Sequence, residues 1–335
     1  MKIAVLHNEV SAESSLDEQD NLIQTRAVAQ ALAELGHEPV SLPFTSHLKH
    51  NLERLKQVRP DVVFNLVESI EGQGRFIHLA PAMLDALDLP YTGAPASAMY
   101  GTSNKLVAKM ILRDHGIPTP GWVDLDSARG SGPVMDGPYI IKSVWEHASL
   151  GLDEDSVVHS ATVDELLGEL ERRLPRLGGN GFAEQFIAGR EFNLSVLASE
   201  NGGEVLPPAE IAFDCYPEDK IRVVGYRAKW EADTFEFHHT PRRFEFLPED
   251  QRLLSRLIEM ARTCWDIFRL RGYARVDFRV DRAGRPWVLE INANPCLSPD
   301  AGFFAACLQA DLTYTQVIER ILQDTARPAW TGFSL

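Results

Sequence analysis

Two segments near the C-terminus, 274–280 and 286–291, constrain the fold of this chain most strongly. Both are rich in apolar and β-branched residues, as strands are. The five residues between them, Asp281-Arg-Ala-Gly-Arg285, are typical of a turn. Together they predict an antiparallel hairpin, in which the turn fixes the register between the two strands.

The predicted hairpin gathers polar side chains on one face. A loop centred on Ala283-Gly284 sets Asp277 opposite Glu290, and the same register sets Arg275 opposite Asn292. Residues two apart on a strand share a face. Because facing carboxylates repel each other, we expect a cation between them, and oxygen ligands favour Mg²⁺ or Mn²⁺. Protein-bound magnesium commonly shares its ligands with phosphates, so the hairpin indicates an enzyme that handles a nucleoside triphosphate.

Composition excludes several classes of protein. The 335 residues suggest about two to three domains. A net charge of −15 argues against a nucleic-acid or anionic-membrane partner. No stretch approaches the roughly 18 consecutive apolar residues of a membrane span, and the N-terminal apolar run is too short for a signal peptide. The four cysteines show no C-x-x-C spacing, so we expect a cytoplasmic protein.

Strands and helices alternate in the first part of the chain. This alternation predicts an α/β domain with a parallel sheet over residues 1–97, from strands at 2–6, 39–42 and 61–66 and helices at 20–35 and 76–87. A smaller α+β region follows over 98–187, with helices at 103–115 and 162–174 and strands at 139–142 and 182–186. A second α+β region over 188–335 holds strands at 191–198, 204–210 and 222–226, helices at 248–268 and 314–322, and the hairpin.

Acidic residues flank a second candidate site. Glu184 ends one predicted strand and Glu191 begins the next, with Phe186, Ile187 and Gly189 between them. The backbone of Phe186 and Ile187 could read an adenine edge, and Glu191 could accept hydrogen bonds from ribose hydroxyls. The alternative is a strand–turn–strand with solvated acids.

Three lysines are candidate phosphate ligands. Lys142 closes an apolar strand, where a lysine is costly without a partner, and a phosphate is one such partner. Lys105 and Lys229 are further candidates; for all three, the alternative is a surface lysine with a buried stem. The loop 147–151 has the small residues that let backbone N–H groups approach a phosphate. The chain contains no Walker-type or dinucleotide-binding glycine motif.

The order of these motifs resembles that of the ATP-grasp superfamily, and within it D-alanine–D-alanine ligases. The resemblance covers essentially the whole chain, and its two most specific motifs are Arg275-x-Asp277 and Glu290-x-Asn292. It implies a three-domain fold, with the nucleotide held between two α+β domains, and a possible homodimer. It also implies residue roles: two Mg²⁺ or Mn²⁺ ions on Asp277, Glu290 and Asn292; ATP phosphates on Lys105, Lys142 and Lys229; adenosine on Glu184, Phe186, Ile187 and Glu191; and catalytic roles for Arg275, Glu13 and Ser149.

The reaction implied by the resemblance is ADP-forming ligation of a carboxylate to an amine through an acyl phosphate. The departures fall at substrate positions. The segment before Glu13 lacks the family's glycines, and Val67 stands where the family has histidine. Ala148, Trp230 and Cys296 replace the family's serine, tyrosine and glycine. The substrates therefore need not be D-alanine, and the acidic residues Asp300, Glu68 and Glu71 suggest a cationic or amine-rich acceptor. The rival hypotheses are a nucleotide-binding protein without ligase activity and another ATP-using enzyme, such as a kinase or carboxylase.

Overall fold

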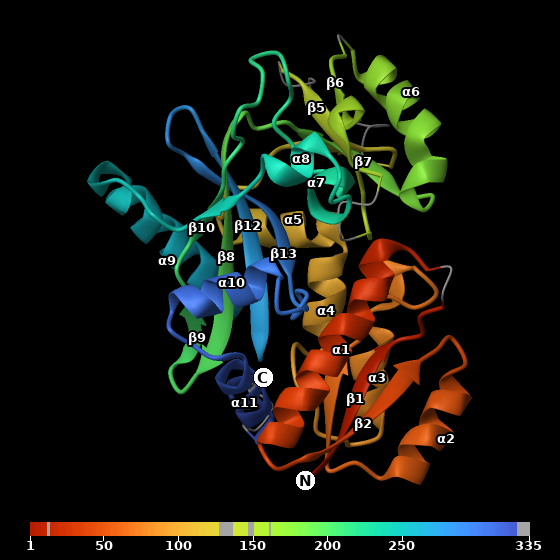
Figure 1. Cartoon of the computed structure of the whole chain (residues 1–335). Helices are drawn as coiled ribbons and strands as arrows, with labels where there is room; N and C mark the ends of the chain where they lie inside the picture. Colours follow the sequence, from red (N-terminus) through yellow and green to blue (C-terminus); the bar gives the residue numbers. More distant parts are fainter. Residues whose placement is uncertain (12–13, 127–136, 147–150, 161, 327–335) are drawn as a thin grey trace.

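The computed structural model describes residues 1–11, 14–126, 137–146, 151–160 and 162–326. Their strands form three sheets, with helices packed around them (Figure 1). The candidate site residues Glu13 and Ser149, and the substrate position Ala148, lie outside the described residues.

The N-terminal sheet is parallel, as the sequence predicts, with strand order β2-β1-β3. Its elements are β1 (Lys2–Asn8), α1 (Leu16–Glu34), β2 (Glu38–Phe44), α2 (Leu48–Val58), β3 (Val62–Leu66) and α3 (Leu79–Ala86). Helix α1 begins four residues earlier than predicted, and Asp17 and Glu18 in its first turn favour this start because they face the positive end of the helix dipole.

The central sheet is antiparallel, with strand order β4-β7-β5-β6. Its strands are β4 (Trp122–Asp124), β5 (Tyr139–Ser143), β6 (Val157–Val158) and β7 (Gly181–Gln185), and α6 (Val163–Arg173) covers it. The predicted helix 103–115 is present as α5 (Lys105–Asp114), and a further helix that was not predicted, α4 (Ala96–Ser103), precedes it. The break between the two helices falls at Asn104, whose extended backbone ends α4 and whose side chain caps α5 by accepting from the N–H groups of Leu106 and Val107.

The largest sheet joins β11, β10, β8, β12 and β13 in that order, with β9 paired to β8. Its strands are β8 (Gly189–Ser199), β9 (Gly202–Val205), β10 (Ala209–Ile211), β11 (Arg242–Arg243), β12 (Tyr273–Asp281) and β13 (Pro286–Asn292). The associated helices are α7 (Tyr226–Trp230), α8 (Phe235–His238), α9 (Gln251–Ile267), α10 (Gly302–Gln309) and α11 (Tyr314–Gln323).

Two strand predictions in this region are wrong. The predicted strand 204–210 is divided into β9 and β10, because Pro207 and Pro208 cannot donate ladder hydrogen bonds. The predicted strand 222–226 forms no strand; it leads into α7 instead. Helix α10 was not predicted.

The hairpin register, in contrast, is confirmed. Asp277 pairs with Glu290 and Arg275 with Asn292, with a bulge after Asp277. Strand β12 lies between β13 and β8, so the hairpin is anchored inside the sheet. Helix α9 packs on one face, while α10 and α11 share the other with the N-terminal unit. No helix in the described part of the chain has the length and apolar character to cross a bilayer.

Candidate nucleotide and metal site

The hairpin presents Arg275 and Asp277 as a bidentate pair. Arg275 Nε lies 2.7 Å from one carboxylate oxygen of Asp277, and Arg275 donates a second bond of 2.8 Å to the other. Asn193 of β8 donates to Asp277 over 2.8 Å. Burial lowers the pKa of the Arg275 guanidinium, but Asp277, together with Glu290, more than offsets this and raises it. The pair therefore holds both charges in place at the centre of the sheet.

Lys105 connects this hairpin to the central subdomain. It is the first residue of α5, and its Nζ lies 3.5 Å from Glu290 Oε1. The same ammonium donates to the backbone carbonyl of Glu146 over 2.7 Å. Its side chain is 9% exposed, so it bridges the two parts from a buried position.

Glu184 on β7 lies between two lysines. Lys142 of β5 pairs with one carboxylate oxygen, and Lys109 of α5 lies 2.6 Å from the other. Burial alone would raise the pKa of Glu184, but the two ammonium groups lower it. Lys142 thus has a protein carboxylate as its partner in this structure, where the sequence suggested a phosphate. The sequence did not single out Lys109.

Glu191 also has a cationic partner that the sequence analysis missed. Arg279 lies 2.7 Å from Glu191 Oε2, is 4% exposed, and packs with its guanidinium carbon 5.6 Å from the ring centre of Phe186. Arg279 follows Arg275 and Asp277 at the same two-residue spacing on β12. This two-residue spacing could have predicted that Arg279 lies on the same face of the strand as Arg275 and Asp277.

A cavity of about 80 Å³ brings six of the predicted site residues together. It is lined by Lys105, Lys142, Glu191, Lys229, Asp277 and Glu290, among others. Burial, reinforced by Arg275, lowers the pKa of Lys229, while Asp277, Glu290 and Glu191 act in the opposite direction. Three lysines and four acidic residues, Glu146 among them, therefore line one small space.

Other predicted residues lie next to this cavity without lining it. Glu184, Phe186 and Ile187 are outside its lining, and so are Arg275 and Asn292. The side-chain oxygen of Asn292 accepts from the N–H of Asn294 over 2.9 Å.

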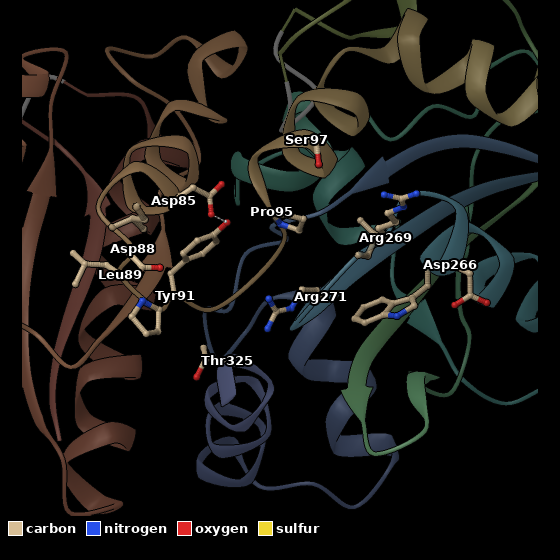
Figure 2. A pocket seen from close by; sticks show the side chains of 14 residues that line it. Asp85, Asp88, Leu89, Tyr91, Pro95, Ser97, Asp266, Arg269, Arg271 and Thr325 are labelled. Carbon is tan, nitrogen blue, oxygen red and sulfur yellow. Dashed lines mark hydrogen bonds between the residues drawn. The ribbon is translucent and has the colours of Figure 1, made fainter. Parts of the chain in front are cut away.

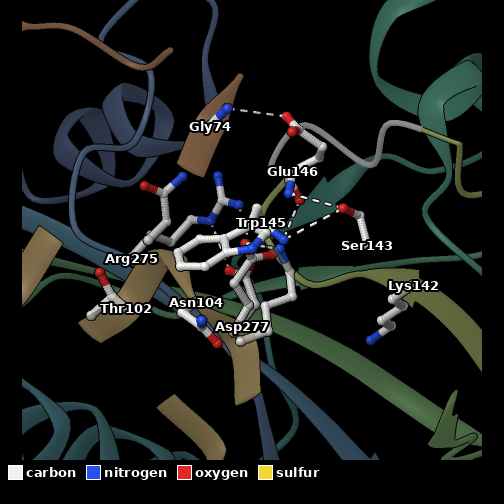
Figure 3. A network of polar contacts seen from close by, with 12 residues as sticks. Gly74, Thr102, Asn104, Lys142, Ser143, Trp145, Glu146, Arg275 and Asp277 are labelled. Carbon is white, nitrogen blue, oxygen red and sulfur yellow. Dashed lines mark hydrogen bonds and ion pairs between the residues drawn. The ribbon is translucent and has the colours of Figure 1, made fainter. Parts of the chain in front are cut away.

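The loop after β5 extends from this site toward the N-terminal unit. Ser143 Oγ accepts from the N–H groups of Trp145 and Glu146, and Glu146 Oε2 accepts from Gly74 N over 3.3 Å. Figure 3 shows these contacts beside Arg275 and Asp277. Glu146, which follows β5, therefore contacts Gly74 of the N-terminal unit and also Lys105, which in turn lies 3.5 Å from Glu290 of the hairpin.

An acidic cluster lies at the end of the site formed by α1 and the segment after β13. Asp20 accepts from Ser298 Oγ at 2.9 Å and from Cys296 Sγ at 2.8 Å. Glu68 accepts from Gln24 and Asn21 of α1. Burial, together with the charge of Asp20, raises the pKa of Glu68 to about 7. Asp20 was not predicted, because it joins Cys296 and Ser298 only through the tertiary fold.

A separate cavity of about 810 Å³ lies between the segment 84–97 and the end of α9 (Figure 2). Tyr91 donates to Asp85 there, and Arg269 and Arg271 face the same space. None of the candidate site residues within the described ranges lines it. Its size alone does not make it the site of the chemistry.

An N-terminal parallel sheet, two further α+β units and a polar hairpin facing lysines define the ATP-grasp class of ligase. The fold is similar to the crystal structure of D-alanine–D-alanine ligase from Bacillus anthracis complexed with ATP: the TM-score is 0.73 with 22% identity, over 97% of each chain. D-alanyl-alanine synthetase A from Vibrio cholerae is similar with a TM-score of 0.72 and 16% identity, over 97% of this chain and 98% of that one.

Sequence comparison identifies the family. The family model described as D-ala D-ala ligase C-terminus matches residues 111–323. An uncharacterized protein, y4sG, from Sinorhizobium fredii is 31% identical over 91% of this chain and 88% of its own length. The D-alanine–D-alanine ligase of Moorella thermoacetica is 28% identical over 98% of this chain and all of its own. The chain therefore belongs to the D-alanine–D-alanine ligase family.

Proposed function

We propose that the protein is an ATP-dependent, ADP-forming ligase that joins the carboxylate of one amino acid to the amine of another. The observation that carries this proposal is the cavity in which Lys105, Lys142 and Lys229 face the carboxylates of Asp277 and Glu290. Membership of the D-alanine–D-alanine ligase family supports it.

The lysines and the β7–β8 connection suit a nucleotide. Lys105, Lys142 and Lys229 bind its phosphates, and Glu184, Phe186, Ile187 and Glu191 form the adenosine site. Arg279 supports that assignment, because it holds Glu191 and packs against Phe186 at once. At about 80 Å³ the cavity is below the roughly 300 Å³ of ordinary ligand sites, so side chains must separate to admit ATP.

The hairpin also fits a divalent cation. Asp277 and Glu290 lie opposite each other on the two strands of the hairpin, and Asn292 adds an amide oxygen. Within the described residues, no three His, Cys, Asp or Glu side chains cluster as a complete metal site. Two carboxylates and an amide suit Mg²⁺ or Mn²⁺, which take remaining ligands from water and phosphates. When bound, one or two such ions neutralise charge on the transferring phosphoryl group.

The reaction has two steps. A carboxylate oxygen of the first substrate attacks the γ-phosphorus of ATP, and ADP leaves with the bonding electrons. The amine of the second substrate then attacks the acyl phosphate; inorganic phosphate departs and the amine nitrogen loses a proton. Arg275 either stabilises the oxyanion of the tetrahedral intermediate or binds the second substrate's carboxylate. Glu13 and Ser149 keep their predicted catalytic roles as proposals.

Substrate identity is a separate proposal. The names of the relatives make D-alanine the first candidate. Asp20 and Glu68 favour an acceptor with an additional amine, because a cation near them would offset two neighbouring carboxylates.

We also propose that the protein is cytoplasmic and forms a homodimer, and that it binds neither nucleic acid nor membranes.

Phosphate and ADP release from ATP, measured with D-alanine, L-amino acids and diamines singly and in pairs, tests the ligase reaction. ADP formation that requires a carboxylate–amine pair, with an amide product by mass spectrometry, is the expected result. ATP binding without stimulation by any pair would favour the nucleotide-binding alternative. Phosphorylation of one substrate without an amide product would favour a kinase.

A further inference from the structure

We infer that Lys109 is a positioning residue for the nucleotide: it neutralises Glu184 and so leaves the charge of Lys142 available to a phosphate. This inference rests on the proposed function, because it assumes that Lys142 and Glu184 belong to the nucleotide site.

The ammonium group of Lys109 contacts three neighbouring side chains. Its Nζ donates to Glu184 Oε1 over 2.6 Å and to Thr119 Oγ1 over 2.8 Å, and the Trp122 ring centre lies 5.3 Å away. Lys109 and Glu184 are each 1% exposed at the side chain. A lysine this deeply buried cannot bind a phosphate itself, so any effect on the nucleotide passes through Glu184.

The balance of charge explains what that effect is. With both lysines protonated and Glu184 ionised, the group carries one net positive charge. Burial lowers the pKa of Lys109, and Glu184 opposes that shift. Lys142 is 15% exposed and lines the cavity, whereas Lys109 does not. The surplus charge therefore faces the cavity. With Lys109 absent, Glu184 would neutralise Lys142, and the attraction to a phosphate would fall.

The contacts also allow a structural role to be separated from this one. Thr119 donates to the backbone carbonyl of Val288 on β13 over 2.9 Å, so Lys109 and Thr119 together link α5 to the hairpin sheet. If Lys109 mattered only for that link, removal of the Thr119 hydroxyl would have the same consequence as removal of the ammonium group.

The test compares Lys109→Met, Lys109→Arg and Thr119→Val for binding of ATP and of adenosine, by calorimetry on the full-length protein. We expect Lys109→Met to weaken ATP binding about tenfold or more and to weaken adenosine binding less, because adenosine carries no phosphate for Lys142 to attract. Lys109→Arg keeps the positive charge and should keep most of the wild-type ATP affinity. Thr119→Val should leave the ATP affinity within about twofold of wild type.

Three results would overturn the inference: equal ATP affinity in Lys109→Met and wild type, equal losses for ATP and adenosine, or a Thr119→Val loss as large as that of Lys109→Met. If Lys109→Met does not fold, Lys109→Gln replaces it, because glutamine keeps a donor to Glu184 without the charge. Wild type that binds no ATP would refute the proposed nucleotide site itself, whereas wild-type binding with an unaffected Lys109→Met refutes only the role of Lys109.

Discussion

At the scale of single residues, the site is organised by carboxylates that each have a cationic partner. Asp277 pairs with Arg275, Glu191 with Arg279, and Glu184 with two lysines. A buried carboxylate without such a partner is costly, so these pairs hold their side chains in single positions. Glu68 and Asp20 differ, because the described partners of Glu68 are amides and those of Asp20 are a hydroxyl and a thiol.

Arg275→Lys tests the bidentate pair. Lysine cannot reproduce two parallel hydrogen bonds to Asp277, so we expect kcat to fall by about 10²- to 10³-fold, the range for loss of an oxyanion donor. ATP affinity should stay within about threefold of wild type, because the phosphate lysines are untouched. Steady-state kinetics and calorimetry measure the two quantities. A normal kcat would contradict the proposed role of Arg275.

Glu68 predicts a pH dependence of stability. Its pKa is raised from 4.5 to about 7 in the fold, so the folded state favours the protonated carboxyl. The contribution to stability is therefore complete below about pH 4.5 and is lost as the pH rises to about 7. His7, whose pKa burial lowers, acts in the opposite sense as the pH falls. Urea unfolding should show a flatter profile between pH 5 and 7 for Glu68→Gln, on about a one-unit grid. An unchanged profile would exclude Glu68 as the titrating group.

At the scale of elements, local sequence patterns predicted the hairpin, whereas contacts between residues far apart in the sequence could not be predicted. The hairpin 274–291 was predicted in register because strands and turn are adjacent in sequence. Residues 222–226 have strand-like composition but form no strand, because composition alone does not decide whether a segment pairs into a sheet. Lys109 and Arg279 escaped notice for a similar reason: their carboxylate partners lie 75 and 88 residues away, on other strands.

Helix α5 depends on its cap. Asn104 accepts from two backbone N–H groups and sets the start of the helix that presents Lys105. Asn104→Ala should lower the free energy of unfolding by about 1 kcal/mol and raise the KM for ATP, because Lys105 loses its fixed position. Thr162→Ala, which removes the cap of α6, is the matched control. It should cost similar stability without changing the KM, and a change of KM in both variants would assign the effect to general destabilisation.

At the scale of the whole molecule, the site depends on three sheets being held together. Apolar residues of β1 and α1 share a core with α10, α11 and the large sheet, so the N-terminal unit and the hairpin sheet are joined. The loop after β5 completes the arrangement through Gly74 and Lys105. The division into 1–97, 98–187 and 188–335 stays a prediction, while the parallel and antiparallel sheets it anticipated are present.

The proposed metal ligand Glu290 also depends on the packing of the whole molecule. Glu290 lies on β13, and Lys105 of α5 lies 3.5 Å from its carboxylate. Glu290→Gln keeps the shape of the side chain and removes one anionic ligand. We expect turnover to fall at least about 10²-fold, with a stronger dependence on Mg²⁺ concentration. Near-normal turnover at low Mg²⁺ would exclude Glu290 as a metal ligand.

The most direct test of the central claim follows oxygen from the first substrate. The first substrate is labelled with ¹⁸O at both carboxylate oxygens and is incubated with ATP and the acceptor that supports ADP formation. An acyl phosphate requires one of these two oxygens to leave in inorganic phosphate. The account predicts one ¹⁸O in the released phosphate for each amide bond formed, measured by mass spectrometry. ADP release with unlabelled phosphate would contradict it.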